Sequence, residues 1–155
     1  MPLGGTTLCK TTEGLDFIST SLARFGGTYP FFLVNPLNSR RAVKVLEIPH
    51  VYQSVADQGV LEDIHRAAIK DASDYLESVK ANLTADGLSV EIDLIEGDNV
   101  AAMLLEAIEE CGADLVVMST HGRTSFDRWR FGSVAQRVAR HTTVTTVLVR
   151  PPQKG

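Results

Sequence analysis

The residue types best suited to bind a ligand follow a predicted strand in the last third of the chain. An apolar run over residues 114–118 ends at Ser119, after which small and polar residues replace the apolar ones. Gly122 lies in this polar stretch, and Gly132 follows it after nine intervening residues. A strand that leads into a glycine loop beside a helix start offers free backbone N–H groups, and the helix dipole favours negative charge there. The spacing therefore predicts an anion site, with phosphate as the anion.

The next helix is predicted over residues 134–140, with Ser133 as its N-cap. Gln136 stands three residues after Ser133 and completes the pattern of a capping box. We expect an anion to contact the loop and this helix start, where the two glycines allow close approach of the backbone. The candidate binding residues are Ser119, Thr120, His121, Gly122, Arg123, Thr124, Ser125, Gly132, Ser133 and Val134.

Charged side chains around the loop allow more than one interpretation. Arg123, Arg128 and Arg130 could neutralise phosphate charge or could simply be solvated, and His121 could donate to a phosphate or lie exposed. No nucleophile and base stand at a spacing that predicts catalysis, and no paired carboxylates lie near the loop. The sequence therefore predicts no catalytic residue and favours a binding protein over an efficient enzyme.

Other known ligand-binding patterns do not occur in the sequence. There is no Gly-Lys-Ser/Thr of a Walker-type loop and no dinucleotide-binding G-x-G-x-x-G. His50, His65 and His141 have no ligand spacing to one another, so no metal site is predicted. The two cysteines, Cys9 and Cys111, form neither a disulfide framework nor a metal pattern.

Length and composition predict a single domain over residues 1–155. A chain of 155 residues is long enough to bury a full core. The net charge of −4 argues against a nucleic-acid partner. No apolar run approaches the ~20 residues of a membrane span, and the first residues lack the pattern of a signal peptide. We therefore expect a cytoplasmic protein without a membrane partner.

Strands and helices are predicted to alternate from residue 43 onward. Short apolar runs predict strands, and apolar residues at three- and four-residue intervals predict helices. The predicted strands are residues 43–48, 88–95, 114–119 and 144–149, and the predicted helices are residues 60–83, 100–111 and 134–140. With one strand before residue 43, this order implies an open, five-stranded, mostly parallel, doubly wound α/β sheet of the Rossmann-like type.

Glycines and capping residues set the expected helix ends. Gly87 and Gly112 are expected to end the two long helices, as glycine commonly does. The helix after Gly97 has Asp98 or Asn99 as its N-cap. The long helix is expected to direct one continuous apolar stripe, Ile64 included, toward the sheet.

Residues 1–42 allow two assignments of the first strand. In one, residues 7–9 form a short strand and residues 15–25 form a helix. In the other, residues 31–34 form the strand and residues 36–39 form a turn, which leaves almost no room for a helix before the next strand. Neither candidate strand ends with an acidic residue, and this part of the chain remains unassigned by its sequence.

The C-terminal third resembles the signature of the universal stress protein family. The matching stretches are Met118-Ser-Thr-His-Gly-Arg-Thr-Ser125, Arg128-Trp129 and Phe131-Gly-Ser-Val-Ala-Gln-Arg-Val138. Nucleotide-binding members of that family carry G-x2-G-x9-G-(S/T), and here Ser119 replaces the first glycine. The resemblance covers residues 43–151 and is strongest from Gly97 onward.

The resemblance implies an adenine-nucleotide-binding protein that acts in stress response through partner interactions. The implied ligand is ATP, with ADP and AMP as alternatives and Mg²⁺ as a companion of the nucleotide. The implied phosphate contacts are the candidate residues named above, and an acidic residue after the first strand would hold the ribose. The family also implies a homodimer through the C-terminal strand, residues 142–150, which is rich in β-branched residues and carries no charge before Arg150.

Two other functions remain open. Ser119 and the missing acidic residue favour a stress-linked interaction protein of the same fold that binds no nucleotide. An enzyme of this fold, such as a nucleotide hydrolase or an adenylyl transferase, would need an acid–base or metal arrangement that the sequence does not contain. Slow ATP hydrolysis is compatible with the resemblance, and the sequence identifies no protein partner.

Overall fold

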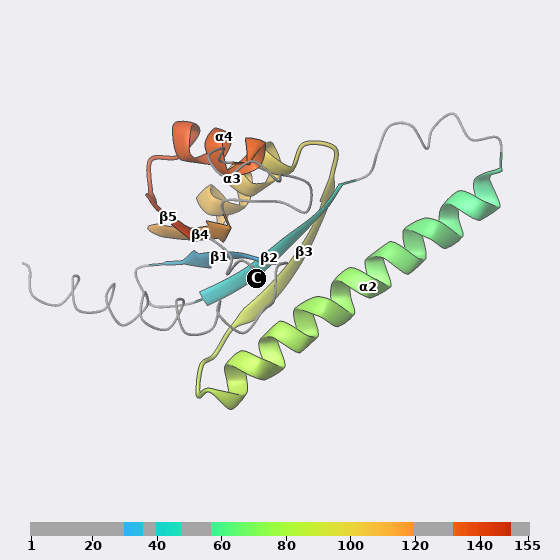
Figure 1. Ribbon diagram of the computed structural model, residues 1–155, viewed down its shortest axis with the longest axis horizontal. Helices are drawn as coiled ribbons and strands as arrows, with labels where there is room; N and C mark the ends of the chain where they lie inside the picture. Colours follow the sequence, from blue (N-terminus) through green and yellow to red (C-terminus); the bar gives the residue numbers. More distant parts are fainter. Residues whose placement is uncertain (1–29, 36–39, 48–56, 120–131, 150–155) are drawn as a thin grey trace, which may run out of the picture.

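The computed structural model describes residues 30–35, 40–47, 57–119 and 132–149 (Figure 1). The described helices are α2 (Gln58–Ala85), α3 (Val100–Glu110) and α4 (Ser133–His141). The described strands are β1 (Phe31–Val34), β2 (Arg40–Glu47), β3 (Glu91–Gly97), β4 (Leu115–Ser119) and β5 (Thr145–Val149). The predicted elements from residue 43 onward are all present, with ends that differ by a few residues.

The five strands form one open, mixed sheet in the order β3-β2-β1-β4-β5. β2 pairs with β3 in parallel and β4 pairs with β5 in parallel, whereas β1 is antiparallel to both β2 and β4. Four strands therefore run in one direction and β1 runs in the other. The predicted fold class, an open, mostly parallel, five-stranded α/β sheet, is confirmed.

β1 is reversed because it forms a hairpin with β2. Residues 35–39 connect the two strands, and Val34 is paired with Arg40 in the register. A parallel crossover needs about a dozen residues or more, so a connection this short can only return antiparallel. The assignment of the first strand to residues 31–34 is thus the one the structure contains, while residues 7–9 and 15–25 lie outside the described residues.

Helices cover both faces of the sheet, with α3 and α4 on one side and α2 on the other (Figure 1). Successive residues of β4 alternate between the two cores: Val116 and Met118 pack with α3 and α4, whereas Leu115 and Val117 belong to the α2 side. All four are buried. A strand buried on both faces reads as a continuous apolar run, which is why β4 could be predicted from its sequence.

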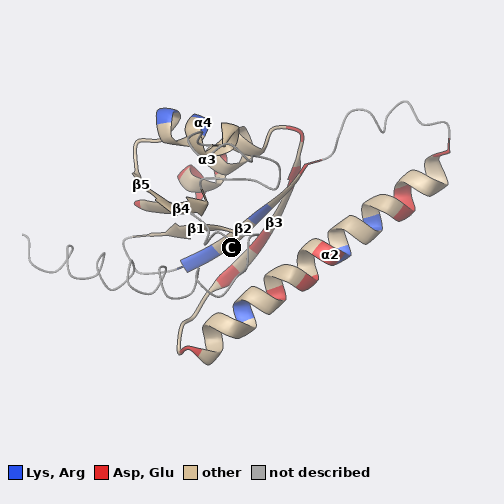
Figure 2. Ribbon diagram, viewed as in Figure 1, with Lys and Arg blue, Asp and Glu red and all other residues tan. Residues whose placement is uncertain are grey.

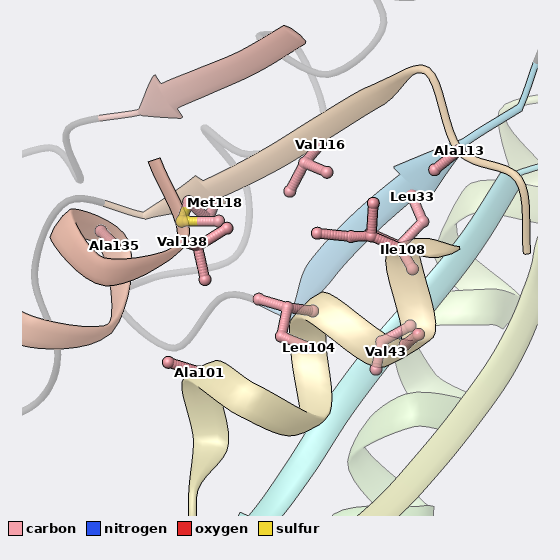
Figure 3. Close-up of a cluster of buried hydrophobic side chains, with 11 residues drawn as sticks. Leu33, Val43, Ala101, Leu104, Ile108, Ala113, Val116, Met118, Ala135 and Val138 are labelled. Carbon is pink, nitrogen blue, oxygen red and sulfur yellow. The ribbon is translucent and has the colours of Figure 1, made fainter. Parts of the chain in front are cut away.

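The core under α3 and α4 is built from small and medium aliphatic side chains (Figure 3). Leu104 and Ile108 of α3 and Val138 of α4 meet Leu33 and Val43 from the central strands. Leu104 and Val138 are completely buried. Removing the side chain of such a leucine costs about 2–5 kcal/mol in the free energy of unfolding. This core fixes α3 and α4 relative to the carboxyl end of β4.

The helix ends explain two of the chain's glycines. Gly87 and Gly112 have φ angles of 83° and 59°, in the left-handed region that favours glycine. Each follows its helix closely, so the predicted ends of α2 and α3 are confirmed. At the start of α2, the carboxylate of Asp57 accepts from the backbone N–H groups of Gly59 and Val60. The sequence analysis missed this cap because it predicted the helix to start at residue 60.

α2 does not direct one continuous stripe to the sheet. Its buried residues are Ala72, Leu76, Val79 and Leu83, all in the C-terminal half. Ile64, predicted to share their stripe, is 46% exposed. That part of the prediction is wrong, because the helix is much longer than the strand beside it. None of the helices in the described residues is long and apolar enough to cross a membrane.

Candidate functional site

The candidate site lies where β4 ends and α4 begins. The chain leaves β4 at Ser119 and returns to pair β5 with β4 in parallel, with Ser119 opposite Val149. A connection between parallel strands must carry the chain back to the amino edge of the sheet, so α4 runs antiparallel to the strands and starts at their carboxyl edge. Ser119 and the first turn of α4 therefore share the edge where open α/β sheets place their ligands.

The predicted N-cap of α4 is wrong by one residue. Gly132 is the N-cap, with φ −55° and ψ 150°, and its carbonyl accepts from the N–H of Gln136 at 2.9 Å. Ser133 is already the first helical residue and is exposed, so its hydroxyl does not cap the helix. The capping-box pattern matched in sequence, but the helix starts one residue too early for that pattern to operate.

The N-cap residue of α4 is Gly132, which has no side chain to accept from the first N–H groups of the helix. The other two described helices begin differently. Asp57 accepts from two N–H groups of α2, and Asn99 accepts from the N–H of Ala102 at 3.1 Å in α3. The first N–H groups of a helix need partners from side chains, water or a ligand. At α4 a ligand can therefore be the partner.

The backbone at Gly132 does not itself require a glycine. Its φ of −55° is accessible to every residue type, in contrast to the positive φ angles of Gly87 and Gly112. A glycine here instead keeps the volume in front of the first turn free of a side chain. That open approach is what an anion contacting the backbone would need.

The described residues include four of the ten predicted site residues: Ser119, Gly132, Ser133 and Val134. Ser119 and Val134 are half-buried and Ser133 is exposed. Thr120, His121, Gly122, Arg123, Thr124 and Ser125 lie outside the described residues, as do Arg128 and Arg130. The structure thus brings together the two ends of the predicted loop, from the end of β4 to the start of α4.

The reversal of β1 changes which groups reach this edge. The carbonyl of Val34, at the carboxyl end of β1, accepts from the N–H of Asp114, which directly precedes β4. The end of β1 therefore lies at the amino edge of β4, opposite the edge that carries Ser119. An acidic residue placed after β1 could not reach a ribose whose phosphates contact the start of α4.

Carboxylates do occur at the carboxyl edge, on β2 and β3. Glu47 ends β2, and Glu96 lies one residue before the end of β3. His65 of α2 contacts Glu96, with 2.8 Å between Nε2 and Oε2. The sequence analysis did not find this pair, because 31 positions separate its members. Of the two N-caps predicted for α3, Asp98 and Asn99, the structure contains Asn99, because β3 continues to Gly97 and the helix starts after Asn99.

A separate hollow lies at the amino edge of β2 and β3. Its volume is about 590 Å³, and Arg41, Lys80, Glu91 and Asp93 contribute charged groups to its lining. Arg41 is already paired, at 3.1 Å from Glu91 and 3.6 Å from Asp93. This hollow is far along the strands from Ser119 and shares no residue with the predicted loop. Among the described residues, no group of three potential metal ligands occurs.

An open, mostly parallel sheet with helices on both faces defines a Rossmann-like α/β domain. The particular family follows from comparison: the chain belongs to the universal stress protein family, whose model matches residues 20–150. This match begins at residue 20, whereas the resemblance found in the sequence analysis begins only at residue 43. The predicted family is confirmed.

Individual relatives agree with this assignment. Universal stress protein MJ0531 of Methanocaldococcus jannaschii is 31% identical over 97 residues, covering 63% of this chain and 56% of the relative. The chain thus matches little more than half the length of that curated relative. A universal stress protein family member from Burkholderia pseudomallei has a TM-score of 0.56 at 24% identity, over 96% of this chain and 90% of that one. Hypothetical protein MJ0577 has a TM-score of 0.61 at 16% identity, over 74% of this chain and 76% of that one.

Proposed function

We propose that this protein binds an adenine nucleotide, ATP in the first place, and acts in the cytoplasm in stress response through nucleotide-dependent partner interactions. The phosphates contact Ser119, the loop over residues 120–125, and the start of α4 at Gly132, Ser133 and Val134. One observation carries the proposal: α4 begins at the carboxyl end of β4 with a glycine N-cap, so its N-cap residue leaves the first backbone N–H groups open to a ligand. The S-x2-G-x9-G-S spacing from Ser119 to Ser133 supports the same site.

In this proposal the phosphates contribute most of the affinity. The end of β1 lies at the opposite edge of the sheet, so a residue directly after β1 would not supply the expected contact to the ribose. Charge-assisted hydrogen bonds from backbone N–H groups to phosphate are stronger than neutral ones. We therefore expect the affinity to fall from ATP to ADP to AMP, as the number of phosphates falls. Mg²⁺ would bind with the nucleotide through phosphate oxygens.

Titration calorimetry with ATP, in the presence and absence of Mg²⁺, tests the proposal. Gly122→Val and Gly132→Val each place a β-branched side chain where phosphate oxygens would approach the backbone, and each is expected to abolish binding. Ala85→Val, at the exposed C-terminal end of α2, is the matched control and should bind like the wild type. Equal affinity in the wild type and both glycine variants would exclude this site.

The competing function is a stress-linked interaction protein that binds no nucleotide. The reversed β1 favours it, because the strand that would position an acidic residue at the ribose runs the wrong way. Ser119 favours it as well, since serine replaces the first glycine of the family pattern. The wild type decides between the two: no heat of binding with ATP, ADP or AMP at millimolar concentration would establish the interaction protein.

We also propose a homodimer through β5. β5 lies at one edge of the sheet and contains no charged residue from Thr145 to Val149. An edge strand without charge presents unpaired N–H and C=O groups to another strand, and a two-fold axis makes the same strand its own partner. Sedimentation of Val147→Lys should give a monomer, while Glu91→Lys on the opposite edge strand should remain dimeric. A monomeric wild type, or a dimeric Val147→Lys, would contradict the interface.

A further inference from the structure

The carboxylate of Glu47, at the carboxyl end of β2, differs from the other carboxylates of β2 and β3. The others each contact a basic side chain: Glu91, Asp93 and Glu96. Figure 2 shows basic residues of β2 beside acidic residues of β3. Glu47 is exposed, and no described residue forms a hydrogen bond or an ion pair with its carboxylate. Glu47 is therefore available to accept hydrogen bonds from a ligand.

Glu47 lies on the same face of the sheet as the start of α4. Side chains of a strand alternate between the two faces, so every second residue shares a face. Val43 and Val45 of β2 pack in the core under α3 and α4, and Glu47 continues their row. Val134 and Ala135, in the first turn of α4, pack in the same core. A ligand on this face, at the carboxyl edge, can therefore contact both α4 and Glu47.

The strand register gives the separation between Glu47 and Ser119. Ala42, Phe32 and Val117 stand side by side across β2, β1 and β4. Ser119 lies two residues beyond this level toward the carboxyl edge and Glu47 lies five residues beyond it, which differ by about 10 Å along the strands. Two strand spacings, about 10 Å, separate β2 from β4. The two Cα atoms are therefore on the order of 14 Å apart.

We propose that Glu47 accepts hydrogen bonds from the ribose hydroxyl groups of a nucleotide whose phosphates contact the start of α4. This inference rests on the proposed function and adds to it the residue that selects the sugar. An extended triphosphate and a glutamate side chain together can bridge the separation between Ser119 and Glu47. In other α/β nucleotide sites an Asp or Glu accepts from the ribose 2′-OH. A residue directly after β1 lies at the opposite edge of the sheet, whereas the neighbouring strand β2 ends at the edge where the phosphates are placed.

This contact selects ribonucleotides over 2′-deoxyribonucleotides. ATP offers its 2′- and 3′-hydroxyl groups as donors to the two oxygens of the carboxylate, whereas dATP lacks the 2′-hydroxyl. Hydrogen bonds to a charged acceptor are stronger than neutral ones, but Glu47 is exposed to water, which competes for the carboxylate. We therefore expect ATP to bind about tenfold more tightly than dATP. An enclosed pocket built to bind the same hydroxyl would discriminate far more strongly.

Titration calorimetry with ATP, dATP and inorganic triphosphate tests the inference. The wild type should bind ATP about tenfold more tightly than dATP, and Glu47→Ala should bind the two with about equal affinity, because the acceptor for the 2′-hydroxyl is gone. Inorganic triphosphate has no ribose, so the wild type and Glu47→Ala should bind it alike. Equal binding of triphosphate also shows that the variant keeps its fold and its phosphate contacts.

Glu96→Ala is the matched control variant. Glu96 lies at the same edge of the sheet, opposite Leu46 in the register, but its side chain contacts His65 on the face that α2 covers. The variant removes the same charge from the same edge, so it should keep the preference for ATP over dATP. 2′-Fluoro-2′-deoxy-ATP is the matched control ligand: its fluorine favours the sugar conformation of a ribonucleotide and donates no hydrogen bond, so the wild type should bind it as it binds dATP.

Failure of this inference can be distinguished from failure of the proposed function. If the wild type binds ATP and dATP with equal affinity, the role of Glu47 is excluded and the phosphate site stands. The same conclusion follows if Glu47→Ala keeps the tenfold preference, or if Glu96→Ala loses it to the same extent. If the wild type binds neither nucleotide and no triphosphate, the proposed function fails, and the role of Glu47 fails with it.

Discussion

The described helices begin in two different ways, and the difference bears on the proposed phosphate site. α2 and α3 each use the side chain of an N-cap residue, Asp57 or Asn99, to accept from their first N–H groups. α4 has Gly132 in that place, and a glycine offers no side chain that could accept. Compared with a glycine N-cap, a capping side chain adds about a few tenths of a kcal/mol, so α4 gives up a small amount of stability that another residue could supply. At α4 that stability would come from a bound anion.

The largest expected effect comes from giving α4 a cap. Gly132→Asp places a carboxylate at the start of the helix, where it accepts from the free N–H groups and repels phosphate. We expect ATP affinity to fall at least about 100-fold, while the free energy of unfolding rises by a few tenths of a kcal/mol. Calorimetric titration and urea unfolding measure the two quantities. Thr84→Asp, on the exposed end of α2, controls for the added charge.

Removing the N-cap of α3 should lower the free energy of unfolding and leave the ATP affinity unchanged. Asn99→Ala leaves the N–H of Ala102 without its acceptor and should lower the free energy of unfolding by about 1 kcal/mol. ATP affinity should not change, because Asn99 caps α3 and the proposed phosphate contacts are at α4. Urea unfolding and titration of the same sample separate the effects. A loss of ATP affinity as large as that of Gly132→Asp would show that the two helix ends do not differ in the proposed way.

A smaller effect is expected where the loop leaves β4. Ser119→Gly restores the first glycine of the family pattern and should tighten ATP binding by about threefold, well under 1 kcal/mol, because the loop can then reach φ angles closed to serine. The half-buried position of Ser119 limits the gain, since its side chain also contributes contacts. Weaker binding by the variant would instead identify the serine hydroxyl as a phosphate ligand.

The smallest effect is expected at the other structural cap. Asp57→Ala removes an acceptor from an exposed helix end that projects beyond the sheet. Because that end can fray without opening either core, the global free energy of unfolding should change by only a few tenths of a kcal/mol. Hydrogen exchange in the first turns of α2 should nevertheless accelerate. A loss of unfolding free energy as large as that of Asn99→Ala would mean that the N-terminal half of α2 is held by contacts outside the described residues.

Local sequence signals predicted much of this fold. The apolar run from Leu115 to Met118 predicted a strand buried on both faces, and Gly87 and Gly112 predicted the left-handed turns that end α2 and α3. Each signal acts within a few residues, so one sequence is enough to detect it. The S-x-x-Q pattern at Ser133 failed because it reports which residues could cap a helix, and the helix start at Ser133 is decided by packing of Ala135 and Val138 in the core.

Pairings between distant residues could not be predicted. The direction of β1 depends on whether its residues pair with β2 locally, and its sequence fits either direction. The contact between His65 and Glu96 joins α2 to β3, and the point at which the two elements meet depends on the length of α2. The capping role of Asp57 was missed because the helix was predicted to start at residue 60, three positions after it. The two ends of the candidate site were predicted, whereas residues 120–131 between them are not among the described residues.

The reversed first strand also has a consequence for the order of folding. β1 and β2 are joined by a connection of a few residues, so their hairpin can form on the microsecond timescale. β1 must also pair with β4, and Leu33 and Val116 stand about 80 positions apart, so this pairing carries a large loop-closure entropy. The pairing of β1 with β4, which we call the β1–β4 seam, joins the part of the sheet that contains β2 and β3 to the part that contains β4 and β5. We therefore expect closure of the β1–β4 seam to limit the folding rate, with the hairpin already formed in the transition state.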